Sequence, residues 1–318
     1  RLNCGSNTFV LKGSALDASY LSNNSPWTNH FHCAIDKTGS VKCWGYDSFS
    51  SVSDTPTTGT FTSLSSGHYH ACGILTSGEI QCWGYGYYGQ TTPPTGTFTS
   101  LSSGYYFSCG IDSTKSIQCW GDNGNGQVSG TPQGSFTEIS SAFEHACGLK
   151  TSGEIQCWGR DVDNQVSDTP SGTFSALSSG AEHTCAISTS GGVQCWGYDG
   201  NNQVSNTPSG TFSTIDSGSH FSCGINTSGG VQCWGNSNVV NSTPSGTYTQ
   251  ISTGEDFACG IKTSGGIDCW GNTTNIKGTP TTGTFVKIEA NVSSTCGILD
   301  SGSVLCWGLD YSNQLTPP

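Results

Sequence analysis

The hydrophobic and polar residues of this chain alternate in short runs, and the same runs return about every 38 residues. In the copy at residues 60–96, the run Thr60–Gly67 alternates bulky and small side chains, which is typical of a β-strand. The runs His70–Leu75 and Glu79–Gly84 predict two further strands. Between them lies Thr76-Ser77-Gly78, a tight turn in which glycine supplies a positive φ.

A shorter fourth strand is predicted near Gln90–Thr92, and it ends at Pro93 and Pro94 because proline removes a donor from the strand ladder. Four short strands in a unit of about 38 residues, with Trp-Gly on the third, are typical of a β-propeller blade. The predicted fold class is therefore all-β, a propeller of four-stranded blades.

Each copy carries two cysteines ten positions apart, and a tryptophan follows the second of them. The tryptophans recur every 36 to 39 residues, which is the signature of a repeat architecture. The eight pairs are Cys33 with Cys43, Cys72 with Cys82, Cys109 with Cys119, Cys147 with Cys157, Cys185 with Cys195, Cys223 with Cys233, Cys259 with Cys269, and Cys296 with Cys306.

The strand pattern predicts that the two cysteines of each pair form a disulfide. If the turn lies at residues 76–78, Ile74 faces Ile80 and Cys72 faces Cys82, and all four point to one face of the hairpin. Opposed residues at a non-hydrogen-bonded site lie within disulfide range. Each bond closes a short loop and is worth roughly 2.5–3 kcal/mol on the chain-entropy estimate. Zinc sites use closer cysteine spacings, so we expect no metal and no cofactor.

Several spaced features of each copy resemble the regulator-of-chromosome-condensation repeat. In the second copy these are Ser66-Gly67-x-x-His70, Gly78-x-Ile80-x-Cys82-Trp83-Gly84 and Gly89-Gln90. The family's Asn-x-x-Gly-Gln-Leu element is visible at residues 122–128, 199–204 and 310–315. The resemblance covers roughly residues 28–318 and implies a β-propeller. The chain departs from the family type by adding a disulfide to every blade, and secreted β-lactamase-inhibitor propellers are similar in repeat length.

The eight copies predict eight blades, with a seven-bladed ring and an outlying repeat as the alternative. We expect the propeller to span residues 28–318, preceded by a segment at 1–27 that does not fit the repeat. Because the last copy ends where the next first strand would begin, this segment must close the ring. Thr8–Leu11 and Ala18–Leu21 are the two candidate strands, and insertion into a neighbouring molecule is the alternative.

Dense disulfides predict an oxidising compartment, so we expect secretion or display at the cell surface. One of the 17 cysteines, Cys4, has no partner in the pattern, which leaves it a free thiol or an intermolecular link. No apolar run approaches the length of a membrane span. Asn-x-Ser/Thr triplets, the acceptors of N-linked glycans, occur at Asn23, Asn226, Asn241, Asn272 and Asn291.

The sequence contains no recognisable catalytic constellation, and we expect no enzyme. The position two residues before the first cysteine of each pair holds Phe in four copies and His in three, which indicates a slot for a flat ring. The carboxylates Glu144, Glu182, Glu255 and Asp256 fall on the loops before the second strands without a regular partner. The run Asp161–Asn164 resembles a calcium loop but lacks its glycine and closing glutamate.

The net charge of −12 argues against nucleic acid as a partner, although related propellers act on chromatin or a small GTPase. The candidate binding residues are tyrosines that break the repeat pattern, since such rings are common at protein and sugar interfaces. They are Tyr85, Tyr87, Tyr88, Tyr105 and Tyr106.

We therefore predict a non-enzymatic extracellular module for structure or protein interaction. One form of this hypothesis is the self-associating, repeating subunit of a surface filament. The alternative is a soluble recognition protein that resembles an inhibitor or binds a glycan through one face of the propeller.

Overall fold

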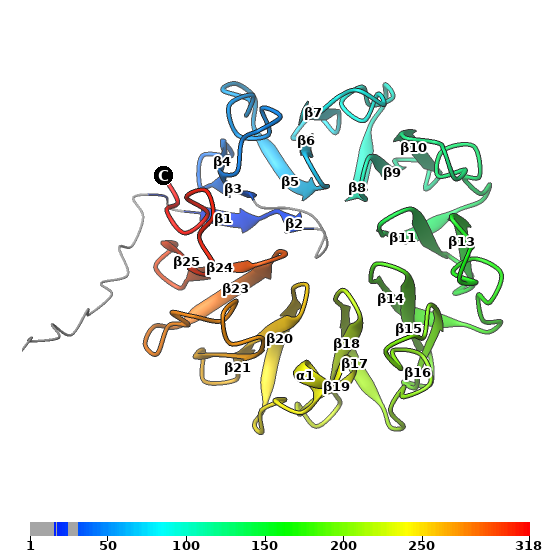
Figure 1. Ribbon diagram of the computed structural model, residues 1–318. Helices are drawn as coiled ribbons and strands as arrows, with labels where there is room; N and C mark the ends of the chain where they lie inside the picture. Colours follow the sequence, from blue (N-terminus) through cyan, green and yellow to red (C-terminus); the bar gives the residue numbers. More distant parts are fainter. Residues whose placement is uncertain (1–15, 17, 25–30) are drawn as a thin grey trace, which may run out of the picture.

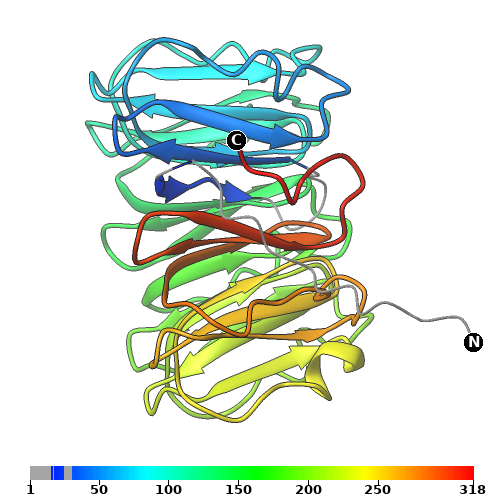
Figure 2. The same ribbon diagram turned by 90° about the vertical axis from the view of Figure 1, so that its left-hand side faces the viewer.

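A computed structural model describes residues 16, 18–24 and 31–318. Its strands form eight sheets that radiate from a common axis, so the ring has eight blades (Figure 1). The pairing is antiparallel except for the short parallel pair of β2 and β5. Seen from the side, the ring is a thick disc with loops on both faces (Figure 2). The prediction of eight blades, rather than seven with an outlying repeat, is confirmed.

The strands of each blade follow one another from the axis outward. Their bounds are, for blade 1, β1 (Ala18–Leu21), β3 (Phe31–Asp36) and β4 (Val41–Gly45); for blade 2, β2 (Asn23–Asn24), β5 (Phe61–Ser66), β6 (His70–Leu75) and β7 (Ile80–Gly84); for blade 3, β8 (Phe98–Ser103), β9 (Phe107–Asp112) and β10 (Ile117–Gly121); for blade 4, β11 (Phe136–Ser141), β12 (His145–Lys150) and β13 (Ile155–Gly159); for blade 5, β14 (Phe174–Ser179), β15 (His183–Ser188) and β16 (Val193–Gly197); for blade 6, β17 (Phe212–Ser217), β18 (Phe221–Asn226) and β19 (Val231–Gly235); for blade 7, β20 (Tyr248–Thr253), β21 (Phe257–Lys262) and β22 (Ile267–Gly271); and for blade 8, β23 (Phe285–Ala290), β24 (Ser294–Leu299) and β25 (Val304–Gly308). A single helical turn, α1 (Ser237–Val240), follows blade 6.

The predicted fourth strand is wrong. The segment around Gln90–Thr92 is a series of turns, and its equivalents in the other copies are turns or, after blade 6, the single helical turn α1. In blade 3, Asn123 Oδ1 accepts bonds from the N–H groups of Val128 and Ser129, and Gln127 Oε1 accepts one from Asn125 N–H. These backbone donors are satisfied by side chains of the same segment, so they are not available to a fourth strand.

The hairpin register is the one that the sequence predicts. Cys72 lies opposite Cys82 and Ile74 lies opposite Ile80, while Gly78 has a φ of 89° in the turn between them. The two cysteines of every pair are opposed in the same way across the second and third strands, with Cα–Cα distances of 4.0–4.1 Å.

Every predicted disulfide forms within its own blade. The bonds join Cys33 to Cys43, Cys72 to Cys82, Cys109 to Cys119, Cys147 to Cys157, Cys185 to Cys195, Cys223 to Cys233, Cys259 to Cys269, and Cys296 to Cys306. The disulfide bonds therefore staple the second strand of each blade to the third and do not link one blade to another.

The hydrophobic core is divided into clusters that lie between neighbouring blades. One cluster joins Phe107 and Ile117 of blade 3 to Phe136 and Trp158 of blade 4. Trp158 Nε1 also donates a 2.9 Å hydrogen bond to the carbonyl oxygen of Gln127 in the preceding loop. Each blade is too thin to have its own core, so stability depends on the contact with the next blade.

The ring closes through strand β1 of the N-terminal segment. Strand β1 pairs antiparallel with β3, which places Leu21 opposite Ala34. On its other side, Ala18 N–H donates a 2.8 Å bond to Gly302 O of blade 8. Trp44 of blade 1 donates a 2.9 Å bond to Gln314 O, the same contact that joins other blades. The alternative strand Thr8–Leu11 and the unpaired Cys4 lie outside the described residues.

A second set of hydrogen bonds links the first strands of adjacent blades around the axis. A side-chain oxygen of one blade accepts from a backbone N–H of the next, as in the bond of Ser103 N–H to Ser65 Oγ at 2.9 Å. Ser102, Ser140, Ser178, Asp216 and Ser252 accept equivalent bonds at 2.7–3.0 Å. This network explains the repeated Ser-Ser at the end of the first strands, which bridges blades that are not paired by their backbones.

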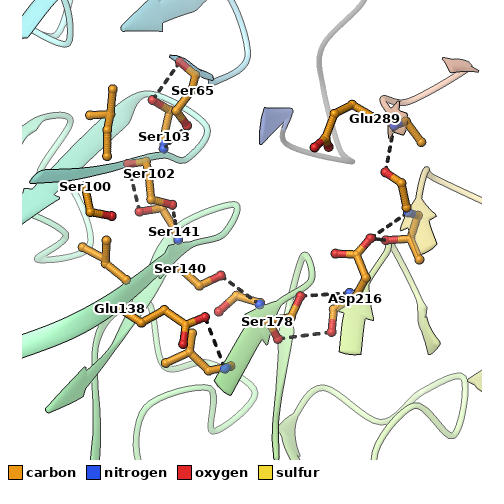
Figure 3. A pocket seen from close by; sticks show the side chains of 18 of the residues that line it. Ser65, Ser100, Ser102, Ser103, Glu138, Ser140, Ser141, Ser178, Asp216 and Glu289 are labelled. Carbon is orange, nitrogen blue, oxygen red and sulfur yellow. Dashed lines mark hydrogen bonds between the residues drawn. The ribbon is translucent and has the colours of Figure 1, made fainter. Parts of the chain in front are cut away.

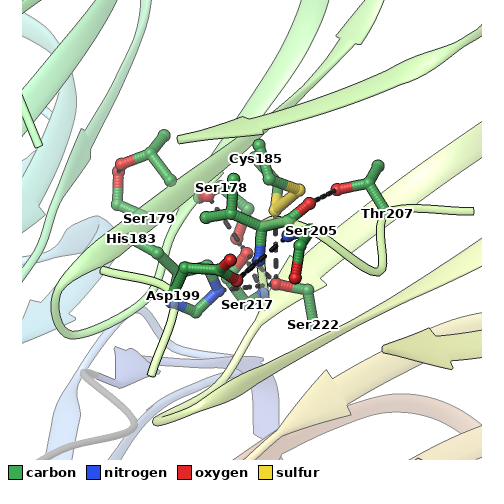
Figure 4. The surroundings of a disulfide bond; sticks show 12 residues. Ser178, Ser179, His183, Cys185, Asp199, Ser205, Thr207, Ser217 and Ser222 are labelled. Atoms are coloured by element: carbon green, nitrogen blue, oxygen red, sulfur yellow. Dashed lines mark hydrogen bonds between the residues drawn. A yellow bond between two sulfur atoms is a disulfide. The ribbon is translucent and has the colours of Figure 1, made fainter. Parts of the chain in front are cut away.

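The slot two residues before the first cysteine holds a buried ring that contacts the next blade. His70 bonds to Ser108 and His145 to Thr184, with Nε2–oxygen distances of 2.8 and 2.9 Å. His183 bonds to Ser222 in the same way at 2.8 Å (Figure 4). Burial lowers the pKa of these histidines to about 3 or 4, so they are neutral. The three histidines therefore have a structural role.

The two residues of this inter-blade pair are matched throughout most of the ring. Where the slot holds Phe, the partner position of the next blade is usually Ala, and the pairs share a core cluster: Phe31 with Ala71, Phe107 with Ala146, and Phe221 with Ala258. Phe257 is the exception, since Thr295 follows in the next blade. At the ring closure the polar pair is reversed, with Ser294 in the slot bonded to His32 at 3.0 Å.

Candidate binding surface

Ten aromatic rings from four consecutive blades form a continuous patch on one face of the ring. They lie on the turns between the first and second strands and at the start of the loops after the third strands. Both positions are on one face because the second and third strands are antiparallel, with His70 opposite Gly84. We call this set the aromatic patch: Tyr46, Phe49, His68, Tyr69, Tyr85, Tyr87, Tyr88, Tyr105, Tyr106 and Phe143.

The rings contact one another across the blade boundaries. His68 of blade 2 stacks on Tyr105 of blade 3 with centroids 4.3 Å apart, and Tyr105 lies 4.3 Å from Phe143 of blade 4. Towards blade 1, the ring of Phe49 is 4.6 Å from that of Tyr69. Such offset and edge contacts hold the rings as a platform.

The outer rings of the patch remain open to solvent. Tyr87 is 80% exposed, while Tyr88 and Phe49 are 43% and 42% exposed. The turns that carry Tyr69 and Tyr106 leave these rings partly buried, and burial raises the pKa of both phenols, which stay neutral. The patch therefore combines a supported base with exposed rings that the core does not require.

The tyrosines predicted from the sequence, Tyr85, Tyr87, Tyr88, Tyr105 and Tyr106, all lie in this patch. Sequence reasoning did not include His68, Tyr69 and Phe143. A signal was present, because aromatic residues occupy the turn before the second strand in three consecutive copies: His68 and Tyr69, then Tyr105 and Tyr106, then Phe143. The contact between turns of different copies depends on how the blades stack.

The disulfide cysteines are not part of this surface, and their role is structural. The first cysteine of each pair is buried. The second is less uniform: Cys157 and Cys306 are buried, whereas the half-buried ones are Cys43, Cys82, Cys119, Cys195, Cys233 and Cys269. All of these sulfur atoms are bonded to a partner in the same hairpin, so none is available as a thiol for binding or catalysis.

Carboxylates border the patch on the side of blades 4 and 5. Glu144 follows Phe143 in the sequence. The guanidinium of Arg160 lies 3.7 Å from the Glu144 carboxylate and 2.6 Å from the Glu182 carboxylate. A third carboxylate, Asp163, lies 3.8 Å from the same guanidinium. Burial raises the pKa of Glu144, with smaller contributions from Asp122 and Glu182.

Two further carboxylates singled out from the sequence, Asp256 and Asp161, have structural partners. Asp256 accepts bonds from Asn272 Nδ2 and Asn275 Nδ2, both at 2.7 Å. Asp161 Oδ1 accepts from the N–H groups of Val166 and Ser167, which closes a turn of the loop. Within the described part of the chain, no group of three or more His, Cys, Asp or Glu side chains is placed to hold a metal ion.

A polar cavity of about 390 Å³ lies where the first strands converge near the axis (Figure 3). Serines make up half of its lining, which also includes the carboxylates of Glu138, Asp216 and Glu289 and no disulfide cysteine. Asp216 accepts bonds from Thr253, and Glu289 pairs with Lys287 at 2.8 Å. Sequence reasoning missed this cavity, because its residues come from seven different copies.

Glu138 makes a testable contribution to the pH dependence of stability. Burial raises its pKa from 4.5 to about 7, so between these values the folded protein holds a proton that the unfolded chain releases. Stability is therefore lost as the pH rises through this window. In urea titrations, Glu138→Gln is expected to raise the free energy of unfolding at pH 8 by up to about 3 kcal/mol, with little change at pH 4.

Glu154, an exposed residue of a hairpin turn, supplies the matched control for this measurement. Glu154→Gln should leave the pH profile unchanged. A Glu138→Gln profile parallel to that of the parent protein would contradict the assignment.

A family model described as the regulator of chromosome condensation (RCC1) repeat matches residues 61–90, 98–127 and 174–203. The crystal structure of Prp20p from Saccharomyces cerevisiae, a protein described with its binding to Gsp1p and histones, superposes with a TM-score of 0.59 at 15% identity. That match covers 90% of this chain and 82% of the yeast chain. Three copies of this chain therefore match the RCC1 repeat, and its fold is that of an RCC1-type β-propeller.

Two plant receptor ectodomains are also similar to this RCC1-type propeller. The ectodomain of the Arabidopsis thaliana receptor kinase ACR4 is 29% identical, with a TM-score of 0.61 over 80% of this chain and 99% of that chain. The ectodomain of the Physcomitrella patens receptor kinase CR4 is 22% identical, with a TM-score of 0.65 over 93% and 74% of the two chains. No curated protein matches the sequence.

The RCC1-type propeller places its candidate glycan acceptors in unequal positions. Asn291 is fully buried, and its Nδ2, the atom that would carry a glycan, bonds to His32 at 3.1 Å. The prediction for Asn291 is therefore incompatible with this fold. Asn241 is exposed, Asn226 and Asn272 are half-buried, and the side chain of Asn23 lies outside the described set. No described helix is long and apolar enough to span a bilayer.

Proposed function

We propose that this propeller is an extracellular, non-enzymatic recognition module that binds a protein partner through the aromatic patch. The observation that carries the proposal is the set of exposed rings over a supported aromatic base. Contiguous exposed apolar surface on a soluble domain is a mark of an interaction site. Tyrosine contributes much contact area at low entropic cost, which favours a role in binding.

Two further observations support an extracellular site of action. Every blade carries a disulfide, and such density is typical of proteins that fold in oxidising compartments. The receptor ectodomain from Arabidopsis thaliana, at 29% identity, is itself an extracellular domain. Among the candidate glycan acceptors whose side chains the structure describes, Asn241 is the exposed one.

The double variant Tyr87→Ala/Tyr88→Ala tests the patch directly. We expect it to lose partner proteins that the parent captures from the medium and cell surface of the source, with retention reduced at least about tenfold, because buried aromatic anchors dominate interfaces. Quantitative mass spectrometry of the captured proteins is the measurement. Equal retention by parent and variant would contradict the proposal.

Tyr311→Ala is the matched control, since Tyr311 is 66% exposed and belongs to blade 8, outside the patch. It should capture the same partners as the parent protein. A glycan array probed with the same variants separates the glycan-binding alternative. If the parent protein binds a glycan and loses it in the Tyr87→Ala/Tyr88→Ala variant, and if no protein partner is captured, the ligand of the patch is a sugar and not a protein.

The alternative is that the protein self-associates into a filament. Cys4 motivates this hypothesis, because it has no partner in the repeat pattern and could form an intermolecular disulfide. Strand β1 occupies its place within its own ring, which favours a self-contained module over strand exchange. Electron microscopy of the protein without reductant distinguishes the two arms. Dispersed rings are expected, whereas regular filaments would make self-association the function.

A further inference from the structure

We infer that the aromatic patch binds an arginine-containing basic segment of its partner. This inference rests on the proposed function and names the chemistry of the partner. Its basis is the combination of open tyrosine faces with carboxylates that surround them.

The loops that form the patch carry negative charge and no positive charge. The segments 46–54, 67–70, 85–92, 104–107, 121–130 and 141–145 contain three aspartates and one glutamate, and no Lys or Arg. They are Asp47, Asp54, Asp122 and Glu144. A partner segment of positive charge is therefore complementary to the patch, and the net charge of −12 adds a long-range attraction.

The carboxylates lie next to the rings. Asp122 N–H donates a 2.9 Å bond to Tyr106 O, which places the residue beside that ring's backbone. Glu144 directly follows Phe143, whose ring lies 4.3 Å from that of Tyr105. A side chain lying across Tyr105 and Tyr106 would therefore meet carboxylates at the edge of the patch.

Arg160, a cation at this edge, does not neutralise it. Arg160 is surrounded by Glu144, Glu182 and Asp163, so three carboxylates face one guanidinium. Two negative charges remain in this group, and Asp122 is close enough to raise the pKa of Glu144. The carboxylates of this edge already bind one guanidinium, that of Arg160. We infer that an arginine of the partner is bound in the same way.

Arginine fits the combination better than lysine. A guanidinium is planar, stacks on an aromatic face and forms forked bonds with a carboxylate, whereas an ammonium is a compact and strongly hydrated charge. Tyr85 and Tyr87 are nearly parallel, with 15° between their planes and centroids 6.3 Å apart. Tyr87, at 80% exposure, offers an open face for such stacking.

The test uses a fluorescein-labelled octapeptide of alternating arginine and serine, with a lysine–serine peptide of equal charge as comparison. Fluorescence anisotropy is measured with the full chain at low ionic strength. We expect the arginine peptide to bind several-fold more tightly than the lysine peptide. Tyr87→Ala/Tyr88→Ala should weaken the arginine peptide by about tenfold, and Tyr311→Ala should leave it unchanged.

A second variant tests the charged edge. Asp122→Asn/Glu144→Gln should weaken binding of both peptides and reduce the salt dependence of the arginine peptide. Unchanged melting temperatures of the variants establish that they are folded. Equal affinity for both peptides, unaffected by the tyrosine changes, would show attraction by net charge only and would overturn the inference.

The outcomes separate this inference from the proposed function. If the tyrosine variant loses its natural partners but keeps the arginine peptide, the patch binds proteins by other chemistry and the inference falls alone. If it keeps both, the inference and the proposed function fail together.

Discussion

Replacing Leu21 by aspartate is expected to open the ring of blades and to lower the free energy of unfolding by about 4 kcal/mol. Leu21 is 1% exposed and packs with Ala18, Ile298 and Val304 at the joint between blades 1 and 8. A carboxylate there would be buried without a partner. Because strand β1 joins the two ends of the repeat array, the substitution weakens the contact between blades 1 and 8 that closes the ring.

Urea unfolding followed by circular dichroism measures the loss of stability, and small-angle scattering measures the opening. Ser19, exposed on the same strand, provides the control, and Ser19→Ala should change stability by less than about 0.5 kcal/mol. A compact Leu21→Asp protein with the stability of the parent would show that β1 does not close the ring. Dimers that form with increasing concentration would indicate exchange of β1 between molecules.

The second large effect is expected at the pair of His183 and Ser222 between blades 5 and 6. Ser222→Ala removes the hydroxyl that lies 2.8 Å from His183 Nε2 and leaves a buried imidazole nitrogen without that partner. The expected loss of stability is about 1–3 kcal/mol. Adding His183→Phe should restore stability to within about 1 kcal/mol, since the double variant reproduces the Phe107 and Ala146 pair of blades 3 and 4.

A double-mutant cycle in urea isolates the coupling between the two positions. The reverse experiment supplies the control, because Ala146→Ser should be destabilising alone and Phe107→His should rescue it. Strictly additive effects in both cycles would mean that the pairs are not matched across the interface.

The pair of His183 and Ser222 also affects how the stability of the protein depends on acidic pH. Burial lowers the pKa of His183 from 6.5 to about 3, so the unfolded chain gains a proton in this window that the folded protein does not. The stability associated with the neutral ring is therefore present above pH 6.5 and is lost as the pH falls towards 3. The double variant His183→Phe/Ser222→Ala should lose less stability over this range than the parent protein.

The failed prediction of a fourth strand shows where a local pattern misleads. The run near Gln90–Thr92 ends at proline as an edge strand does, but Gln90 Oε1 accepts a bond from Tyr88 N–H within the same segment. The carbonyl oxygen of Gln90 then accepts from Trp120 of the next blade. Strand and turn compete for the same backbone groups, and the inward-facing glutamine decides the outcome.

The sequence by itself determined what lies within one hairpin. Cys72 and Cys82 are ten positions apart around a tight turn, so alternation and the turn at Gly78 leave one register and one disulfide. The number of blades follows from the number of copies for the same reason, since each copy forms the disulfide-bonded hairpin of its blade from its own residues.

Only the tertiary structure decided what lies between copies. The choice of Ala18–Leu21 as closing strand, the bond of His32 to Ser294 across 262 positions, and the contact of Tyr105 with Phe143 depend on how one blade stacks on the next. A repeating pattern specifies each blade almost identically, so it carries little information on which side chains meet at a boundary. Those contacts are set by the packing and closure of the whole ring, which is a property of the folded chain.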